Sequence, residues 1–92
     1  MVVFTWDEKK RSLNLTKHGI DFRDAAIVFD GPLVTVEDMR EDYGEPRYVA
    51  LGLLVGVVVS LTYTERGDRI RVISIRKAQK HETRFFYAQI GK

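Results

Sequence analysis

The hydrophobic and polar positions in the first twenty residues predict a short strand followed by a surface helix. Residues 4–6 alternate as a strand does. Asp7 follows as a natural N-cap, and the helix that it opens runs to about Lys17. Leu13 and Leu15 are the clear apolar positions of this helix. We therefore expect it to lie on the surface with one narrow apolar stripe facing inward.

A second helix follows after a clear stop signal. Gly19 can adopt the left-handed conformation that ends many helices, and Asp21 can cap the next one. The apolar residues after it recur at helical spacing, and the segment 30–32, Asp-Gly-Pro, ends the pattern. These apolar residues are Phe22, Ala25, Ala26 and Phe29.

The rest of the chain changes to a strand-like period and then returns to a helical one. Four runs have the composition of strands, separated by the polar segment 37–45 and by tight turns at Gly56 and at 65–68. The runs cover residues 33–36, 47–55, 57–64 and 69–77, and the segment 79–88 favours a helix. The predicted class is α+β, in the order β-α-α-β-β-β-β-α, with an antiparallel sheet and helices grouped against it.

Composition sets the size of the core and the class of protein. A chain of 92 residues with 45% hydrophobic content predicts one domain, residues 1–92, with a single modest core. The absence of cysteine excludes a disulfide framework and a thiolate metal site. The longest apolar run, 49–63, contains two glycines and is too short for a membrane-spanning helix, and the N-terminus lacks a signal pattern. We expect a cytoplasmic protein that makes no membrane contact.

Charge is distributed unevenly, although the net charge is only +2. Residues 21–45 hold eight acidic side chains against two basic ones, and residues 65–92 hold eight basic side chains against three acidic ones. A basic face can collect phosphates on a nearly neutral molecule, because the local field depends on where the charges lie. The alternative is that the two segments pair with each other inside the fold.

The segment 66–76 places four arginines in an otherwise apolar, β-branched run. Arginine keeps its charge at every working pH and presents a planar fork of donors that matches phosphate. Strict alternation puts Arg71 and Arg76 on opposite faces of a strand, so both can reach one site only if a bulge intervenes. Arg47, which opens the preceding hairpin, can join them if the strand register allows it. Phosphate contact and internal or intermolecular salt bridges both remain open for these arginines.

Motifs along almost the whole chain resemble the BrnT-type toxins. They are F-T-W-D at 4–7, Asn14, K-H-G-I at 17–20, F-R-D-A at 22–25, V-F-D at 28–30, E-P-R at 45–47, T-E-R-G at 64–67 and R-V-I-S-I-R-K-A at 71–78. The resemblance implies a RelE-like fold, ribonuclease activity and inhibition by a BrnA-type antitoxin that carries a ribbon-helix-helix DNA-binding domain. One departure is Phe86, where the family's C-terminal tyrosine is expected, with Tyr87 beside it.

Cleavage of RNA is a chemistry that these side chains can support. The 2′-hydroxyl attacks the adjacent phosphate, and arginines stabilise the extra negative charge on the phosphoryl oxygens. We assign this role to Arg47, Arg71 and Arg76, and expect slow turnover without a metal ion or another cofactor. Glu82 can orient its basic neighbours. Substrate contacts are expected from Arg66, Arg69, Lys80 and His81.

Two hypotheses from different classes remain at this point. The first is an endoribonuclease toxin that arrests translation and growth and is neutralised by a BrnA-type antitoxin. Such a toxin contacts operator DNA only through its antitoxin. The second is a non-catalytic interaction module that binds an antitoxin in an operator-binding repressor complex. Both are compatible with a toxin homodimer inside that complex. They differ in whether the purified protein cleaves RNA.

Overall fold

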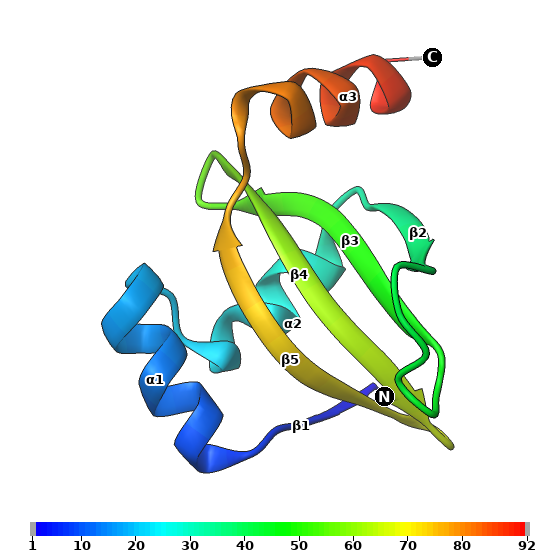
Figure 1. Cartoon of the computed structure of the whole chain (residues 1–92). Coiled ribbons are helices and arrows are strands. Elements are labelled where there is room, and N and C mark those ends of the chain that lie inside the picture. Colours follow the sequence, from blue (N-terminus) through cyan, green and yellow to red (C-terminus); the bar gives the residue numbers. More distant parts are fainter. Residues whose placement is uncertain (1, 92) are drawn as a thin grey trace.

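A computed structural model of the chain describes residues 2–91 and contains five strands and three α-helices within that range (Figure 1). The elements, in chain order, are β1 (Val3–Thr5), α1 (Glu8–His18), a 3₁₀ turn η1 (Phe22–Asp24), α2 (Ala25–Asp30), β2 (Val34–Asp38), β3 (Arg47–Leu54), β4 (Val57–Arg66), β5 (Arg69–Lys77) and α3 (Lys80–Ile90). No helix within residues 2–91 is long and apolar enough to cross a membrane.

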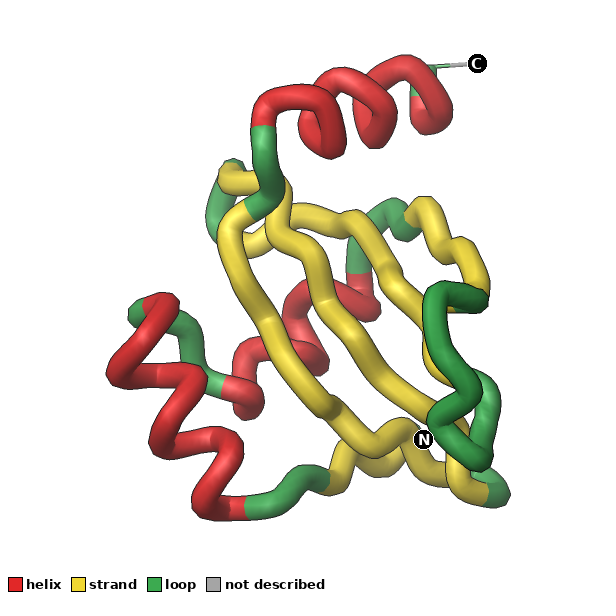
Figure 2. Tube along the Cα trace, in the orientation of Figure 1, coloured by secondary structure: helices red, strands yellow, loops and turns green. Residues whose placement is uncertain are grey.

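The strands form one mixed sheet in the order β1-β5-β4-β3-β2 (Figure 2). The α+β class is confirmed, but the prediction of a wholly antiparallel sheet is wrong, because β1 pairs with β5 in parallel. The first strand is followed by helices rather than by a hairpin, so its partner comes from the far end of the chain and nothing local fixes its direction. The predicted second helix also differs, since it opens as the separate turn η1 before α2.

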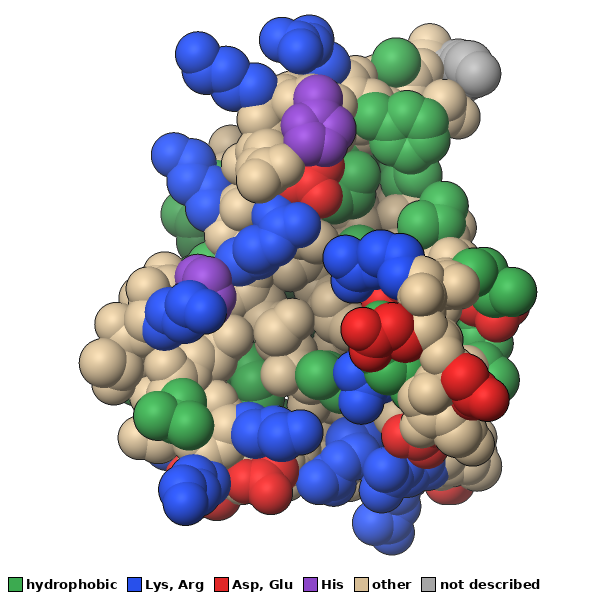
Figure 3. Space-filling view, viewed as in Figure 1, with side chains coloured by type: hydrophobic (Ala, Val, Ile, Leu, Met, Phe, Trp, Pro, Cys, Tyr) green, Lys and Arg blue, Asp and Glu red, His purple; other side chains and the backbone are tan. Residues whose placement is uncertain are grey.

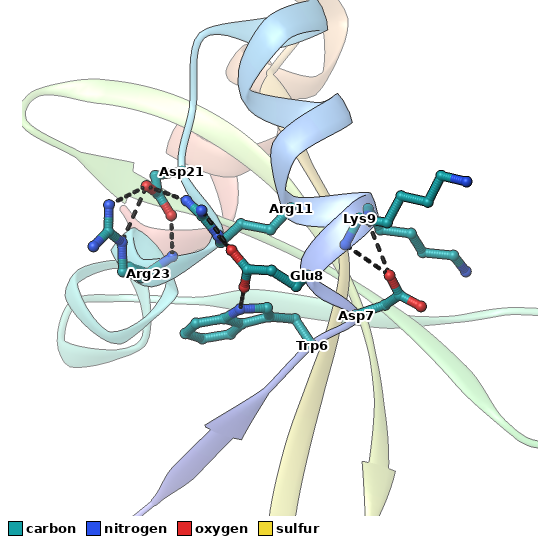
Figure 4. A network of polar contacts seen from close by, with 8 residues as sticks. Trp6, Asp7, Glu8, Lys9, Arg11, Asp21 and Arg23 are labelled. Carbon is teal, nitrogen blue, oxygen red and sulfur yellow. Dashed lines mark hydrogen bonds and ion pairs between the residues drawn. The ribbon is translucent and has the colours of Figure 1, made fainter.

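Side-chain caps fix the starts of α1 and η1 (Figure 4). The Asp7 carboxylate accepts the backbone N–H groups of Lys9 and Lys10, which confirms the predicted N-cap. Gly19 has a φ of 70° and ends α1 as predicted. The Asp21 carboxylate then accepts the backbone N–H of Arg23, so the start of η1 is capped as well.

The inward face of α1 is polar, and the prediction of an apolar stripe is wrong. Leu13 and Leu15 are 62% and 41% exposed, whereas Asn14 is 7% exposed. The Asn14 side-chain amide donates to the carbonyls of Ile20 (3.0 Å) and Ile75 (2.9 Å), and its oxygen accepts the Ile75 N–H at 3.2 Å. Strand β1 ends opposite Arg71, so Ile75, which pairs with Leu61 of β4, has no strand partner on its other side. The amide of Asn14 pairs with both backbone groups there, as a neighbouring strand would.

The main core lies between one face of the sheet and the segment η1–α2, which is behind the sheet in the view of Figure 1. Phe22, Val28, Leu61 and Ile75 are fully buried there. Gly52 on β3 allows the close approach of α2, because a Cβ atom on it would lie 2.7 Å from Val28 Cγ1.

A smaller core cluster holds α3 against one end of the opposite sheet face. Phe86 is fully buried in it, against Leu51 and Val58. The position where the family resemblance leads one to expect a tyrosine is therefore a packing position in this chain. Tyr87 is half exposed beside it, with its ring edge-on to Phe86.

The turn between β3 and β4 contains a backbone conformation that valine adopts poorly. Val55 has a φ of 49° and is 88% exposed, and Gly56 follows with a φ of 78°. Asparagine tolerates this left-handed region much better than a β-branched residue, and Asn-Gly is the preferred pair for such hairpins. We expect Val55→Asn to stabilise the protein by about 1 kcal/mol, measured as the free energy of unfolding in urea. The same substitution at Val57, which has no positive φ, is the control and should not stabilise.

Candidate functional site

The sheet face opposite α2 is lined by hydroxyl and guanidinium groups, and we call it the open face. On β4, Val59, Leu61 and Tyr63 enter the main core, so the alternating residues Ser60, Thr62 and Thr64 lie on the other side. The open face is defined here by Arg47, Val49, Ser60, Thr62, Thr64, Arg71, Ser74 and Arg76.

A β-bulge in β5 brings the two candidate arginines of this strand to the open face. Thr62 pairs with Ser74, but the next residue of β4, Tyr63, pairs with Val72, so Ile73 is an extra residue between them. An extra residue reverses the alternation beyond it. Arg71, opposite Thr64, and Arg76, opposite Ser60, therefore lie on the same side of the sheet.

Arg47 and Arg71 lie on either side of Thr64. Arg71 is directly opposite Thr64 on β5, and the pairing of Tyr48 with Tyr63 places Arg47 next to Thr64 on the β3 side. Two strand spacings separate the arginines, about 10 Å between their Cα atoms. Thr64 is fully buried, and its hydroxyl donates to the Pro46 carbonyl at 2.6 Å, which fixes the start of β3 against β4. This row can place two guanidinium groups on one anionic ligand.

The Arg47 guanidinium is held by an aromatic ring rather than by a carboxylate. Its Cζ lies 4.1 Å from the centre of the Tyr43 ring, which is a cation–π geometry. The Tyr43 hydroxyl donates to the buried Asp38 at 3.1 Å, and this contact fixes the ring. The Nε of Arg47 is buried with no hydrogen-bond partner among the described residues. A buried donor without a partner is costly, so Arg47 gains if its side chain turns this N–H toward an acceptor.

Asp38 is the anchor of the loop that carries Tyr43. Its carboxylate accepts two side-chain hydrogen bonds from Arg40, at 2.9 and 2.8 Å, and one from the Arg40 backbone. These bonds hold the pKa of Asp38 well below its usual range, so the carboxylate is ionised at neutral pH. The pKa of Arg76 is raised, chiefly by its hydrogen bond to Glu82, and the like charge of nearby Arg40 only partly opposes this. Arg40 therefore adds positive charge near Arg76.

Arg76 is oriented by the first turn of α3. Its Nη1 and Nη2 atoms donate to the two carboxylate oxygens of Glu82 at 2.8 and 2.9 Å. Glu82 also accepts the backbone N–H of Gln79 at 2.8 Å as part of a capping box. The hydrogen bond from Arg76 is the main cause of a lowered pKa for Glu82. An ionised, doubly bonded Glu82 fixes the plane of the Arg76 guanidinium.

The other candidate residues lie in two places. Lys80 and His81 are exposed in the first turn of α3, beside Glu82. Arg66 and Arg69 face each other across the β4–β5 turn, at the opposite end of the strands, and Arg66 pairs with Glu45 at 3.2 Å. The structure thus brings Arg47 and Arg71 together in one row. Arg76 lies two rows away with the α3 residues, about 13 Å along the strand from Arg71.

The acidic segment 21–45 and the basic segment 65–92 largely do not neutralise each other. Of the ion pairs among the described residues, Arg66–Glu45 is the one that joins the two segments. In the view of Figure 3, basic side chains lie above and below the open face, acidic side chains lie along its right-hand side, and much of its middle is uncharged. The uneven charge of the sequence therefore gives the folded surface regions of different electrostatic potential.

Sequence reasoning missed part of this site. Ser60, Thr62 and Thr64 could have been predicted to share one face of β4. They alternate with the apolar residues of the strand, which predicts that they lie on the side away from the core. Asp38 and Arg40 were counted as part of a polar loop, and no local pattern marks them, because Asp38 becomes a site residue only through the pairing of β2 with β3.

The open face is suited to binding a phosphodiester. It offers fixed guanidinium groups, a floor of hydroxyls and one buried donor without a partner. Among residues 2–91, no three His, Asp or Glu side chains lie close enough together to hold a metal ion. Developing negative charge on a bound phosphate would be met by arginine.

Comparison with known proteins gives one family. The sequence model of the family described as "Ribonuclease toxin, BrnT, of type II toxin-antitoxin system" matches residues 6–82. The matched range contains every candidate site residue from Arg47 to Glu82. No curated protein matches the chain at a significant level.

Proposed function

This chain belongs to the BrnT family of ribonuclease toxins of type II toxin–antitoxin systems, and we propose that its open face is the endoribonuclease active site. The observation that carries the proposal is the bulge at Ile73, which aligns Arg71 and Arg76 on the face that also bears Arg47. An arginine-rich face with few carboxylate partners is what binding of an RNA backbone requires.

The proposed reaction uses the nucleophile of the substrate itself. The 2′-hydroxyl loses its proton and its oxygen bonds to the adjacent phosphorus, while the bond from phosphorus to the 5′-oxygen of the next nucleotide breaks. That 5′-oxygen takes up a proton. The products are a 2′,3′-cyclic phosphate and a 5′-hydroxyl. Negative charge grows on the non-bridging phosphoryl oxygens during this step, and stabilising it lowers the barrier.

We assign this stabilisation to three arginines. Arg47 is best placed to bind a phosphoryl oxygen, because its partner is an aromatic ring and no carboxylate among the described residues occupies its donors. Arg71 lies across Thr64 from it and makes no ion pair among the described residues. Two N–H groups of Arg76 already donate to Glu82. Arg76 therefore contributes positive charge and helps to orient the substrate, and does not make a bidentate contact with the phosphate.

The surrounding basic residues extend the substrate contact. Lys80 and His81 in α3 lie beside Arg76, and Arg66 and Arg69 lie beyond Arg71, so an RNA strand that crosses the open face meets basic groups at both ends. Guanidinium groups supply positive charge where a nuclease of another type would place a metal ion. We therefore propose metal-independent cleavage.

The family also implies an antitoxin partner. We propose that this partner is of the BrnA type, with a ribbon-helix-helix domain that carries the complex to operator DNA. RNA cleavage by the free toxin would arrest translation and growth in the cytoplasm. Membership of a family of ribonuclease toxins supports this biological role.

Removal of metal ions tests the proposed chemistry. We expect the purified protein to cleave single-stranded RNA equally well with and without excess EDTA, and to leave 2′,3′-cyclic phosphate and 5′-hydroxyl ends, identified by mass spectrometry. RNA with 2′-deoxy substitution at the cleaved position should stay intact, because it lacks the nucleophile. Loss of cleavage in EDTA, restored by Mg²⁺, would contradict the proposed mechanism. RNA that stays intact under all conditions would favour the non-catalytic interaction module.

A further inference from the structure

A second basic surface lies outside the arginine rows, between α1 and the bulged part of β5. A cavity of about 230 Å³ is lined there by Lys10, Leu13, Asn14, Lys17 and His18 of α1 and by Ile73 and Ser74 of β5. We call it the α1 groove. None of these residues belongs to the phosphate-stabilising set described above.

The groove exists because two features of the fold coincide at this edge of the sheet. Strand β1 ends opposite Arg71, so no strand pairs with the outer edge of β5 beyond that point. Helix α1 lies along this edge and is joined to it through the contacts of Asn14 with Ile75 (Figure 1). The bulge places Ile73 in the resulting notch.

The α1 groove continues into the open face. Ser74 lines the groove and is also the partner of Thr62, between the row of Arg71 and the row of Arg76. A strand that leaves the middle of the open face across β5 therefore enters the groove without crossing another element.

The chemistry of the groove matches a nucleic acid strand. Lys10 and Lys17 lie on one face of α1, two helical turns apart, which is about 10 Å. Neither makes a salt bridge among the described residues. Leu13 is 62% exposed between them, so an apolar surface for a ribose or base lies beside cations for phosphates. At about 3.4 Å per nucleotide of a stacked strand, the lysines span about three nucleotides.

We propose that the α1 groove is an RNA-backbone track that holds the substrate strand next to the scissile phosphate, with Lys10 and Lys17 as phosphate contacts. This proposal rests on the proposed ribonuclease function. It adds a determinant of substrate length, because an RNA that is too short to leave the open face cannot reach the track.

Binding of RNAs of two lengths tests the track. The probes are 2′-O-methyl oligonucleotides of about four and about twelve nucleotides, which the protein cannot cleave, with affinities measured by fluorescence anisotropy. We expect K10Q/K17Q to weaken binding of the longer RNA about tenfold and of the shorter RNA less than twofold. The salt dependence for the longer RNA should fall by a slope of about 1.4, the value for two lost contacts to a single strand.

The matched control is K9Q/K77Q, which removes the same charge at residues outside the groove. It should leave the affinity for both RNAs within twofold of wild type. Equal losses in the two double variants, or an unchanged affinity of K10Q/K17Q for the longer RNA, would overturn the track while wild-type cleavage still supported the proposed function. If K10Q/K17Q keeps its RNA affinity but no longer binds the antitoxin, the groove is a protein contact and the proposal is wrong. A wild-type protein that binds neither RNA would overturn the proposed function and the track together.

Discussion

Arg71→Ala is expected to lower the rate of RNA cleavage in EDTA by about 10²- to 10³-fold, the usual loss when one group that stabilises the transition-state charge is removed. The side chain is half-buried on the open face, opposite Thr64, and no ion pair among the described residues holds it. Its loss should therefore change the site and leave the core intact. The rate is measured under single-turnover conditions, so that product release does not mask the chemical step.

Two further variants separate charge from position. Arg84→Ala removes the same charge from an exposed position of α3 outside the candidate site, and should keep the wild-type rate within about twofold. Arg71→Lys keeps the charge but loses the planar fork, so it should recover only part of the activity. Thermal unfolding and antitoxin binding should stay close to wild type in all three. Full cleavage by Arg71→Ala would remove this residue from the site.

Asn14→Ala is expected to destabilise the fold by about 3 kcal/mol, because it leaves a buried N–H and a buried carbonyl of Ile75 without partners. The amide also holds the end of α1 through the Ile20 carbonyl. The free energy of unfolding from urea titration measures the effect. Asn14→Asp should be destabilising too, since its carboxylate cannot donate to the Ile75 carbonyl.

Leu13→Ala is the matched control on the same helix. Leu13 is 62% exposed, so its truncation should change the free energy of unfolding by less than about 0.5 kcal/mol. The contrast tests whether a polar contact or an apolar stripe attaches α1 to the sheet. A larger loss for Leu13→Ala than for Asn14→Ala would show that the apolar stripe carries the attachment after all.

Prediction from the sequence succeeded for features that depend on neighbouring residues. Capping of α1 by Asp7 and its termination at Gly19 depend on a few neighbouring residues, and both are confirmed. The strands of the two hairpins were found for the same reason, with ends that differ by a residue or two. Local chemistry decides such features, so the chain itself displays them.

Features that depend on distant pairing could not be read in this way. The parallel partner of β1, the inward role of Asn14 and the placement of Arg71 and Arg76 on one face all depend on the position of β5 relative to other elements. Asn14 stood among the motifs of the family resemblance, but an isolated asparagine in a polar helix has no periodicity that predicts burial. The need for a bulge could be stated from the sequence, whereas its presence could not.

The bulge at Ile73 makes the number of residues in β5 as important as their identity. If the same residues paired without the bulge, strict alternation would return, and Ile75 and Arg76 would exchange sides relative to Val72. The main core would then receive a guanidinium group, and the RNA-facing surface would receive an isoleucine. Deletion of Ile73 would remove only this extra residue and would leave Ser74, Ile75 and Arg76 on their present sides of the sheet. The composition of the two faces of β5 therefore depends on where its pairing with β4 is interrupted as well as on the order of its residues.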